Sequence, residues 1–386
     1  MVLKIKNARV VAEDKVIENG ILVAEDGIIA YIGDENGSYA DEIYDAEGNY
    51  LVAGFVDIHS HGGNGYDFMD ATAEEMLEIS KFHLTHGTTT LVATTVTDTW
   101  ENIEHALDTY KALGDNRLTL NGVHLEGPWF SPEQCGAQSV SQMDRPSTEK
   151  LAYLIKKYPF IRRISLAPEV DEGFEVGRFG KENGVIIALG HTDADFDTVE
   201  SAAENGYSLI THLYSGMKGV TRVNAYRIAG AVEAGLYDDS LTAEVIADGK
   251  HLPAALLKLI YKCKGADKIC LITDSMRGAG MPEGSEVLLG SKAQKNFAII
   301  EDGVAKLPDR KSFAGSVATT DRLFRTFGTL TGVPVTELSK MASATPAKVM
   351  GYSDRGVIKE GKLADLVVLD EGSNVKGVFF RGAAVK

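Results

Sequence analysis

The sequence has few cysteines and no long hydrophobic run. Its three cysteines among 386 residues are an odd number, too sparse for a disulfide framework and without the C-x-x-C spacing of a metal site. No apolar stretch is long enough for a signal peptide at the start of the sequence, or for a membrane span elsewhere. These absences predict a protein of the reducing cytoplasm that has no membrane partner.

Positive charge is also scarce. The 39 lysines and arginines are outnumbered by 55 acidic residues, which gives a formal net charge of −16. Binding to nucleic acid or to an anionic membrane requires a basic face, so neither is expected as a partner. An anionic substrate would need a local group of cations to hold it against the field of the whole protein.

Both ends of the sequence resemble short β-strands joined by tight turns, without helical periodicity. The predicted strands span residues 3–11, 20–24, 28–32, 366–369 and 375–380. Asp26-Gly27 is a strong hairpin signal between two of them. We therefore expect residues 1–52 and 346–386 to form one small β-sandwich domain from two distant segments.

Between these ends the pattern changes to alternating apolar strands and helices. Eight near-continuous apolar runs occur at residues 54–58, 89–95, 118–125, 161–167, 185–189, 209–213, 241–247 and 269–273. Such runs are typical of buried parallel strands, and eight βα units favour an α/β fold with a (β/α)8 TIM barrel over residues 53–345. An open doubly wound sheet is the alternative, but no Gly-x-Gly-x-x-Gly motif opens a first helix.

Residues 285–310 interrupt the alternation and predict a β-hairpin insertion.

Histidine and acidic side chains stand at the predicted strand ends. They are His59 and His61 at the first strand, Glu126 at the third, His191 at the fifth, His212 in the sixth and Asp274 at the eighth. The carboxyl ends of barrel strands converge on one face, so these groups are expected to meet. Other histidines do not share this position. His124 is expected to be a hydrogen-bonded barrel residue, and His83, His86 and His105 to lie at the surface or at helix caps.

Imidazole and carboxylate groups in this arrangement suit a divalent metal such as zinc or iron. His59 and His61 are two residues apart on a strand and point to the same side, and Glu126 can bind one ion or bridge two. A bound metal brings the pKa of water near neutrality, and Asp274 is suited to take that proton and return it to a leaving nitrogen. Each residue alone is more often structural, but six of them at five strand ends favour a metal site.

The motifs at these positions resemble the amidohydrolase superfamily and, within it, the N-acetylglucosamine-6-phosphate deacetylases. Superfamily-wide motifs are FVDIHSHG at 55–62 and GKLADLV at 361–367; more specific ones are HLEGPW at 124–129, GHT at 190–192, THLY at 211–214, IADGKH at 246–251 and LITDS at 271–275. Many relatives bridge two metals with a carboxylated lysine on strand four. Here that strand ends in Leu166-Ala167-Pro168-Glu169, without a lysine.

The resemblance implies a hydrolase that removes the acetyl group of a phosphorylated amino sugar. It also implies one or two divalent ions, with zinc first and iron, manganese or cobalt as alternatives, and a homodimer whose neighbouring subunit contributes to the phosphate pocket. By position it implies Glu126, His191 and His212 as metal ligands, His59 and His61 as ligands of a second ion, Asp274 as the catalytic aspartate, and His251, Ser215 and Gly216 as substrate-binding residues.

Two departures from the family pattern affect the substrate more than the reaction. Gln138 stands where members often have a sugar-contacting histidine, and an amide cannot carry a positive charge. The phosphate-binding Arg-Glu-Pro-Gly stretch is absent, and residues 222–230 replace it. Arg222, Arg227 and Lys250 are candidates for that role, because guanidinium and ammonium groups both bind phosphate. An amidohydrolase of a different amide or N-acetyl compound, or a non-catalytic scaffold on the same fold, are the alternatives.

Overall fold

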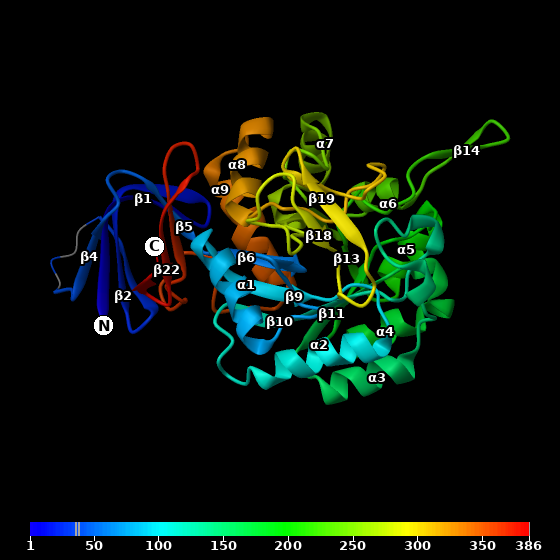
Figure 1. Ribbon diagram of the computed structural model, residues 1–386. Helices are drawn as coiled ribbons and strands as arrows, with labels where there is room; N and C mark the ends of the chain where they lie inside the picture. The colour runs from blue at the N-terminus through cyan, green and yellow to red at the C-terminus, as the bar shows by residue number, and fades with distance from the viewer. Residues whose placement is uncertain (35–36, 38, 386) are drawn as a thin grey trace.

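The computed structural model describes residues 1–34, 37 and 39–385. In it, the strands at the two ends of the chain pair with one another in a single sheet (Figure 1). The strands are β1 (Val2–Ala12), β2 (Lys15–Glu25), β3 (Ile28–Gly33), β4 (Glu42–Asp45), β5 (Tyr50–Ala53), β21 (Leu366–Leu369), β22 (Val375–Phe380) and β23 (Ala383–Ala384). Their order is β23-β22-β21-β5-β1-β2-β3, with β4 beside β1. The two ends of the chain are joined where β5 pairs antiparallel with β21 and Val52 lies opposite Val367.

This terminal sheet folds around a core of its own. Tyr44 of β4 and Phe379 of β22 belong to strands that are not neighbours, yet their ring centroids are 5.1 Å apart. Leu3, Leu22 and Leu366 are buried in the same cluster. The predicted β-rich unit from both termini is confirmed, and the two faces of the sandwich are parts of one continuous sheet.

A second sheet of eight parallel strands forms the barrel (Figure 1). Its strands in spatial order are β6 (Phe55–Ser60), β9 (Thr88–Thr94), β10 (Leu120–Glu126), β11 (Ile161–Leu166), β12 (Ile186–Leu189), β13 (Tyr207–Ile210), β16 (Thr242–Val245) and β17 (Ile269–Leu271). The segment after β17 closes the ring, because the amide of Asp274 donates to the carbonyl of His59 over 2.9 Å. Each predicted apolar run overlaps one of these strands, so the (β/α)8 prediction is confirmed.

Helices cover the outside of the barrel sheet. They are α1 (Ala73–Thr85), α2 (Trp100–Ala112), α3 (Thr148–Lys157), α4 (Glu175–Glu182), α5 (Phe196–Glu204), α6 (Ala231–Tyr237), α7 (Ala254–Lys264) and α8 (Thr320–Thr331), followed by α9 (Val335–Ser339) and α10 (Thr345–Val349). Helix α1 begins at a capping box in which the Thr72 hydroxyl accepts from the amide of Glu75 and the Glu75 carboxylate accepts from the amide of Thr72. Within the described part of the chain, no helix is both long and apolar enough to cross a membrane.

The inside of the barrel is apolar at one end and polar at the other. Ile58, Leu209 and Ile272 lie in an apolar cluster, and Ala347 and Met350, within and just after α10, pack against it. The histidines and carboxylates lie at the carboxyl ends of the strands. The predicted domain boundaries, with one domain at 1–52 and 346–386 and the other at 53–345, stay a prediction. Ala347 and Met350 fall within the predicted small domain, yet they pack against the barrel.

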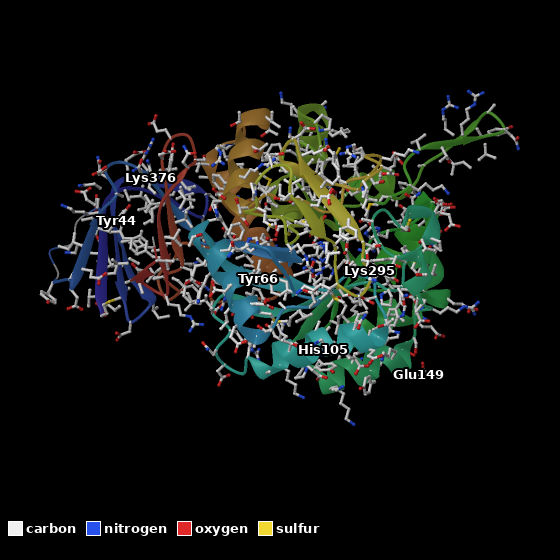
Figure 2. All side chains as sticks on the ribbon, viewed as in Figure 1. Tyr44, Tyr66, His105, Glu149, Lys295 and Lys376 are labelled. Atoms are coloured by element: carbon white, nitrogen blue, oxygen red, sulfur yellow. The ribbon has the colours of Figure 1, made fainter. Side chains whose placement is uncertain are left out.

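Two insertions follow the sixth and eighth strands of the barrel. Strands β18 (Glu286–Leu288), β19 (Phe297–Glu301) and β20 (Val304–Lys306) form an antiparallel sheet where a hairpin was predicted. Strands β14 (Thr221–Val223) and β15 (Tyr226–Ile228) form a hairpin that the sequence did not predict. Figure 2 shows the side chains of this second hairpin standing away from the rest of the protein.

His83 on α1 is buried, so the expectation of a surface or capping role is wrong for this residue. Its side chain is 0% exposed, and Nε2 lies 3.0 Å from the carbonyl oxygen of Gly62. His124 is a hydrogen-bonded barrel residue as predicted, with Nε2 2.7 Å from Ser165 Oγ and Nδ1 3.3 Å from Thr94 Oγ1.

The buried His83 predicts a loss of stability in acid. Burial lowers the pKa of His83 to about 4, whereas an imidazole in the unfolded chain titrates near 6.5. Between these values the unfolded chain binds the proton and the folded chain does not, so stability falls as the pH drops through this window, by up to about 3 kcal/mol. His83→Gln keeps a donor for Gly62 and cannot titrate. Denaturant unfolding of the metal-free protein between pH 7 and 4 should show a shallower decline for this variant; equal slopes would contradict the assignment.

Candidate metal centre

Three residues of the predicted site have a backbone conformation that side-chain-bearing residues rarely adopt. His191, His212 and Asp274 have φ angles of 46°, 29° and 46°. Each lies just beyond the end of a barrel strand, at β12, β13 and β17 respectively. Such strain persists only where the surrounding structure enforces it, and it is concentrated at functional sites. Here it accompanies the turn that directs three polar side chains toward one another.

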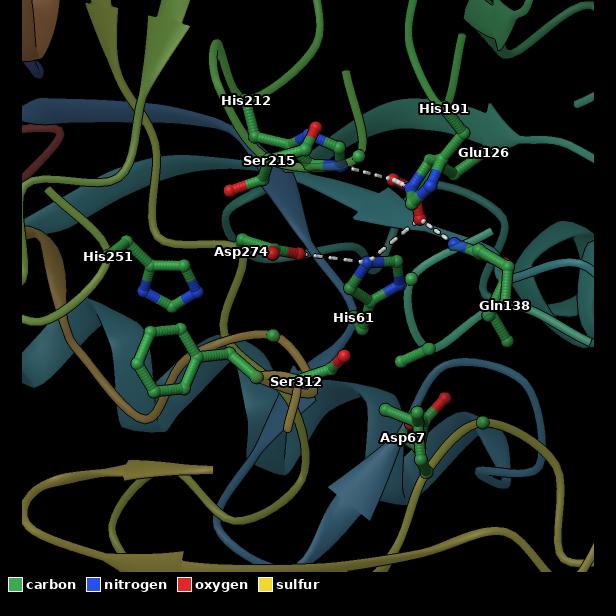
Figure 3. A pocket seen from close by; sticks show the side chains of 18 residues that line it. His61, Asp67, Glu126, Gln138, His191, His212, Ser215, His251, Asp274 and Ser312 are labelled. Atoms are coloured by element: carbon green, nitrogen blue, oxygen red, sulfur yellow. Dashed lines mark hydrogen bonds and ion pairs between the residues drawn. The ribbon is translucent and has the colours of Figure 1, made fainter. Parts of the chain in front are cut away.

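Glu126 lies at the centre of the histidines (Figure 3). Its Oε1 is 3.0 Å from His212 Nε2, 3.4 Å from His191 Nε2 and 3.5 Å from His59 Nε2. Its Oε2 is 3.3 Å from His61 Nε2. Glu126 is 1% exposed, so the structure brings all four predicted imidazoles to one buried carboxylate.

Asp274 also contacts two of these imidazoles, those of His59 and His61. Its Oδ1 lies 3.1 Å from His61 Nε2 and 3.5 Å from His59 Nε2. Two trios of buried groups, His59–His61–Asp274 and His59–Glu126–His212, each have one atom per residue within 4.8 Å of the others. The six residues predicted from the ends of five strands thus form one cluster.

The orientation of the imidazoles fits a divalent metal. The Nδ1 atom of His59 lies 3.0 Å from Glu244 Oε2, that of His191 lies 2.9 Å from the Gln134 carbonyl, and that of His212 lies 3.2 Å from the Ser215 carbonyl. An acceptor at Nδ1 places the proton there and leaves Nε2 with its lone pair facing the cluster, as a ligand requires. Neutral imidazole and carboxylate form the donor set of zinc, iron, manganese and cobalt sites.

The carboxylates of the cluster remain ionised despite their burial. Burial acts to raise the pKa of Glu126, but the surrounding imidazoles, His59 first, hold that pKa well below the usual range. Burial likewise opposes ionisation of Asp274, and the neighbouring imidazoles, His61 first, keep its pKa below the ordinary value. A ligand and a proton acceptor both need the anionic form.

A cavity of about 240 Å³ opens onto the cluster (Figure 3). The predicted substrate-binding residues Gln138, Ser215, Gly216 and His251 line it. Gln138 Nε2 donates to Glu126 Oε2 over 2.7 Å, and its Oε1 accepts from the amide of Thr97 over 2.9 Å. The amide of Gln138 is therefore held by Glu126 and Thr97 instead of being free to turn toward a ligand.

His251 is held against one wall of the cavity. Its Nδ1 lies 2.9 Å from Asp248 Oδ2, and its ring lies 4.7 Å from that of Phe313. The side chain is 6% exposed. The Asp248 carboxylate places the proton on Nδ1 and leaves Nε2 available to a ligand in the cavity.

The predicted phosphate-binding cations lie outside this cavity. Arg222 and Arg227 are exposed on β14 and β15, where they lie opposite each other, and Lys250 is exposed. Among the residues that the structure describes, no arginine or lysine lines the cavity. The cavity of a single chain therefore contains imidazoles but no permanent cation.

Several residues of the site were not foreseen from the sequence. Asp67, Leu289, Gly290 and Phe313 line the cavity, the last three from the segment around the β18–β20 insertion. Glu244 Oε2 lies 3.0 Å from His59 Nδ1. A single charged residue inside the apolar run 241–247 was the available signal for Glu244. The position of the insertion after the eighth strand indicated the loop side of the barrel, but not which of its residues line the cavity.

Comparison with known proteins identifies the family. Residues 50–385 match the model of the Amidohydrolase family. The chain belongs to the amidohydrolase family. The N-acetylglucosamine-6-phosphate deacetylase of Bacillus subtilis is 35% identical to it, over 98% of this chain and 96% of that protein. The N-acetylgalactosamine-6-phosphate deacetylase of Escherichia coli O157:H7 is 32% identical, over 97% of each chain.

A solved structure of a deacetylase closely matches this amidohydrolase. The N-acetyl-D-glucosamine-6-phosphate deacetylase of Mycobacterium smegmatis, a mutant in complex with N-acetyl-D-glucosamine-6-phosphate, superposes with a TM-score of 0.91. Sequence identity is 30%, and the match covers 100% of this chain and 99% of that one. The predicted family resemblance and fold class are confirmed.

Proposed function

We propose that this amidohydrolase removes the acetyl group of N-acetylglucosamine-6-phosphate, giving glucosamine-6-phosphate and acetate. The observation that carries the proposal is the cluster of Glu126, His61, His191 and His212 at the base of a cavity with Asp274 beside it. The relatives that match nearly the full chain support the same substrate class. Hydrolysis of another amide or N-acetyl compound is the alternative, because the phosphate-binding stretch departs from the family pattern.

We infer that Glu126, His191 and His212 hold one divalent ion, zinc first among the candidates with iron, manganese and cobalt as alternatives. His59 and His61 are placed to hold a second ion. A metal at this position polarises an amide carbonyl and makes a bound water acidic near neutral pH. We also propose a cytoplasmic location, as the few cysteines and the lack of long hydrophobic runs predict.

The side chains of the protein supply the proton transfers. Asp274 accepts the proton of the attacking water and then delivers it to the nitrogen of the departing amine, which requires the anionic form at the start. His61 Nε2 lies 3.1 Å from Asp274 Oδ1, so the carboxylate is held next to the ligands of the cluster. His251 and Ser215 are placed to bind the sugar from the cavity wall.

We further propose a homodimer in which the β14–β15 hairpin contributes to the phosphate pocket of the partner subunit. The hairpin carries Arg222 and Arg227 into solvent with exposed apolar residues, including Val223 at 51% and Tyr226 at 78%. Exposed apolar side chains on a projecting element are typical of an interaction surface. A cation supplied by a partner would complete a cavity that has none of its own.

This arrangement predicts that loss of a hairpin arginine weakens binding of the phosphorylated sugar and leaves the unphosphorylated sugar unaffected. Arg222→Ala or Arg227→Ala, whichever contacts the phosphate, should raise KM for the 6-phosphate substrate by roughly 10–100-fold, as expected for a hydrogen bond to a charged group worth about 1.5–3 kcal/mol. Rates on the unphosphorylated sugar should not change. Steady-state kinetics on both sugars, with sedimentation to give the oligomeric state, test this. Wild-type KM in both variants would exclude the hairpin from phosphate binding.

Acetate release tests the function directly. The protein is stripped with a chelator and restored with zinc, iron, manganese or cobalt in turn, and acetate is measured from N-acetylglucosamine-6-phosphate, its galactosamine epimer and unphosphorylated N-acetylglucosamine. We expect no turnover without metal and the fastest turnover on a 6-phosphate sugar. Turnover that is independent of the phosphate favours the alternative substrate class, and absence of turnover with every metal contradicts the proposal.

A further inference from the structure

A buried ion pair lies next to the histidine cluster inside the barrel. Arg163 of β11 and Glu244 of β16 are both 0% exposed, and Arg163 Nη1 contacts Glu244 Oε1. Barrel interiors are ordinarily filled by branched apolar side chains, and removing two charges from water costs several kcal/mol for each ion. The pair therefore needs a reason beyond filling space.

The second oxygen of Glu244 faces the metal centre. Glu244 Oε2 lies 3.0 Å from His59 Nδ1 and accepts from the backbone amide of His212 over 3.3 Å. Because a carboxylate only accepts hydrogen bonds, the proton of the His59 ring lies on Nδ1. His59 Nε2 then keeps its lone pair, and it faces His61 Nε2 at 3.3 Å and the carboxylates of Glu126 and Asp274 at 3.5 Å.

Arg163 fixes both Glu244 and the strand that carries His59. Its Nη1 also donates to the carbonyl of Ile58 over 3.2 Å, and its Nη2 donates to Ser165 Oγ over 3.4 Å. Ser165 Oγ in turn lies 2.7 Å from Thr211 Oγ1. These hydrogen bonds leave the carboxylate of Glu244 with one orientation.

The rings of the other ligands have Nδ1 acceptors outside this pair, and the contact of Glu244 with His212 is to the backbone amide. His191 and His212 have their own Nδ1 acceptors in the carbonyl groups of Gln134 and Ser215. At Nδ1, His59 contacts a buried carboxylate, whereas His191 and His212 contact backbone carbonyl groups. Loss of Glu244 should therefore act on His59 and spare the ion held by Glu126, His191 and His212.

We propose that Arg163 and Glu244 are positioning residues that hold His59 with its proton on Nδ1 and so determine whether a second metal ion binds. The inference rests on the proposed function, since it concerns an ion beside the one at Glu126. Arg163 and Glu244 are buried outside the lining of the cavity, so they act through His59.

The experiment compares two variants with the wild-type protein. Glu244→Gln weakens the acceptor, and Glu244→Leu with Arg163→Met removes both charges together, which avoids an uncompensated buried charge. Asp171→Asn is the control, because Asp171 is a buried carboxylate that accepts from Val176, Gly177 and Tyr207 away from the cluster. Nitrogen-15 NMR of the histidine rings in the metal-free proteins, assigned with His59→Gln, reports which nitrogen of His59 carries the proton.

Zinc titration with a competing chelator measures how many ions bind and how tightly. We expect two ions in the wild-type protein and the control, and a second ion weakened by about 10–100-fold in both test variants, with the first unchanged. We also expect the His59 proton to leave Nδ1 in the double variant.

Three outcomes would overturn the proposal. The first is a double variant that keeps the Nδ1 proton and binds the second ion with wild-type affinity. The others are a single ion in the wild-type protein and equal weakening of both ions in the test variants. No ion in the wild type would instead contradict the proposed function, while the NMR result would still test the positioning role.

Discussion

Asp274→Asn is expected to lower kcat by about 10²–10⁴-fold, the range that general acid–base catalysis contributes. Asparagine has nearly the same shape, but its amide cannot accept the proton of water or return one to the amine nitrogen. The carboxylate lies 3.1 Å from His61 Nε2 with its pKa held below the ordinary value, so the wild-type group begins each cycle as an anion. Steady-state acetate release measures the loss.

The control for this variant is metal content. The amide keeps a carbonyl oxygen toward His61, and Glu126, His191 and His212 are untouched, so the ion that they bind should remain at wild-type occupancy by elemental analysis. Asp321→Asn replaces a buried carboxylate on α8 that faces His86, and it should turn over at the wild-type rate. Near-native kcat for Asp274→Asn would remove Asp274 from the proton transfers.

Glu126→Gln is expected to remove both metal and activity. Glu126 lies within 3.5 Å of four imidazole Nε2 atoms, and its negative charge offsets the charge of an ion in a buried site. An amide supplies one neutral oxygen and cannot bridge two ions. A Lewis acid stabilises the transition state by several kcal/mol, so its loss corresponds to roughly 10³-fold or more in kcat.

Metal analysis shows whether Glu126→Gln loses activity because it loses the metal ion. We expect reduced occupancy after dialysis and partial recovery of activity at high metal concentration, because His191 and His212 keep their orientation. Gln138 donates to Glu126 Oε2, so Gln138→Leu serves as a milder comparison that leaves all ligands in place. Full metal occupancy together with wild-type kcat in Glu126→Gln would contradict a metal role for this carboxylate.

The barrel and the composition of its site could be predicted because both follow from local patterns. Apolar runs such as 161–167 and 185–189 mark buried parallel strands, and the chemistry of a barrel gathers at the strand ends. His191 and Asp274 could therefore be assigned to one cluster although they are far apart in the sequence. Their catalytic and ligand roles remain predictions.

The rest depends on contacts that no local pattern encodes. The β14–β15 hairpin turns at Asn224-Ala225, where both residues have positive φ, and the sequence lacks the Asn-Gly signal that usually marks such a turn. Glu244 is a lone charge in an apolar run, but only the closing of the sheet places it beside Arg163. The cavity wall formed by Leu289 and Phe313 depends on how an insertion lies over the barrel.

The pairing of β5 with β21 has a consequence for synthesis of the chain. Residues up to Ala53 leave the ribosome early, but their partner strand begins at Leu366, so roughly 15–60 s pass at ordinary elongation rates before it emerges. During this interval β5 has an open edge that other chains can pair with. A truncation before Leu366 would leave that edge permanently exposed, so such fragments should aggregate even though every strand of the barrel is present.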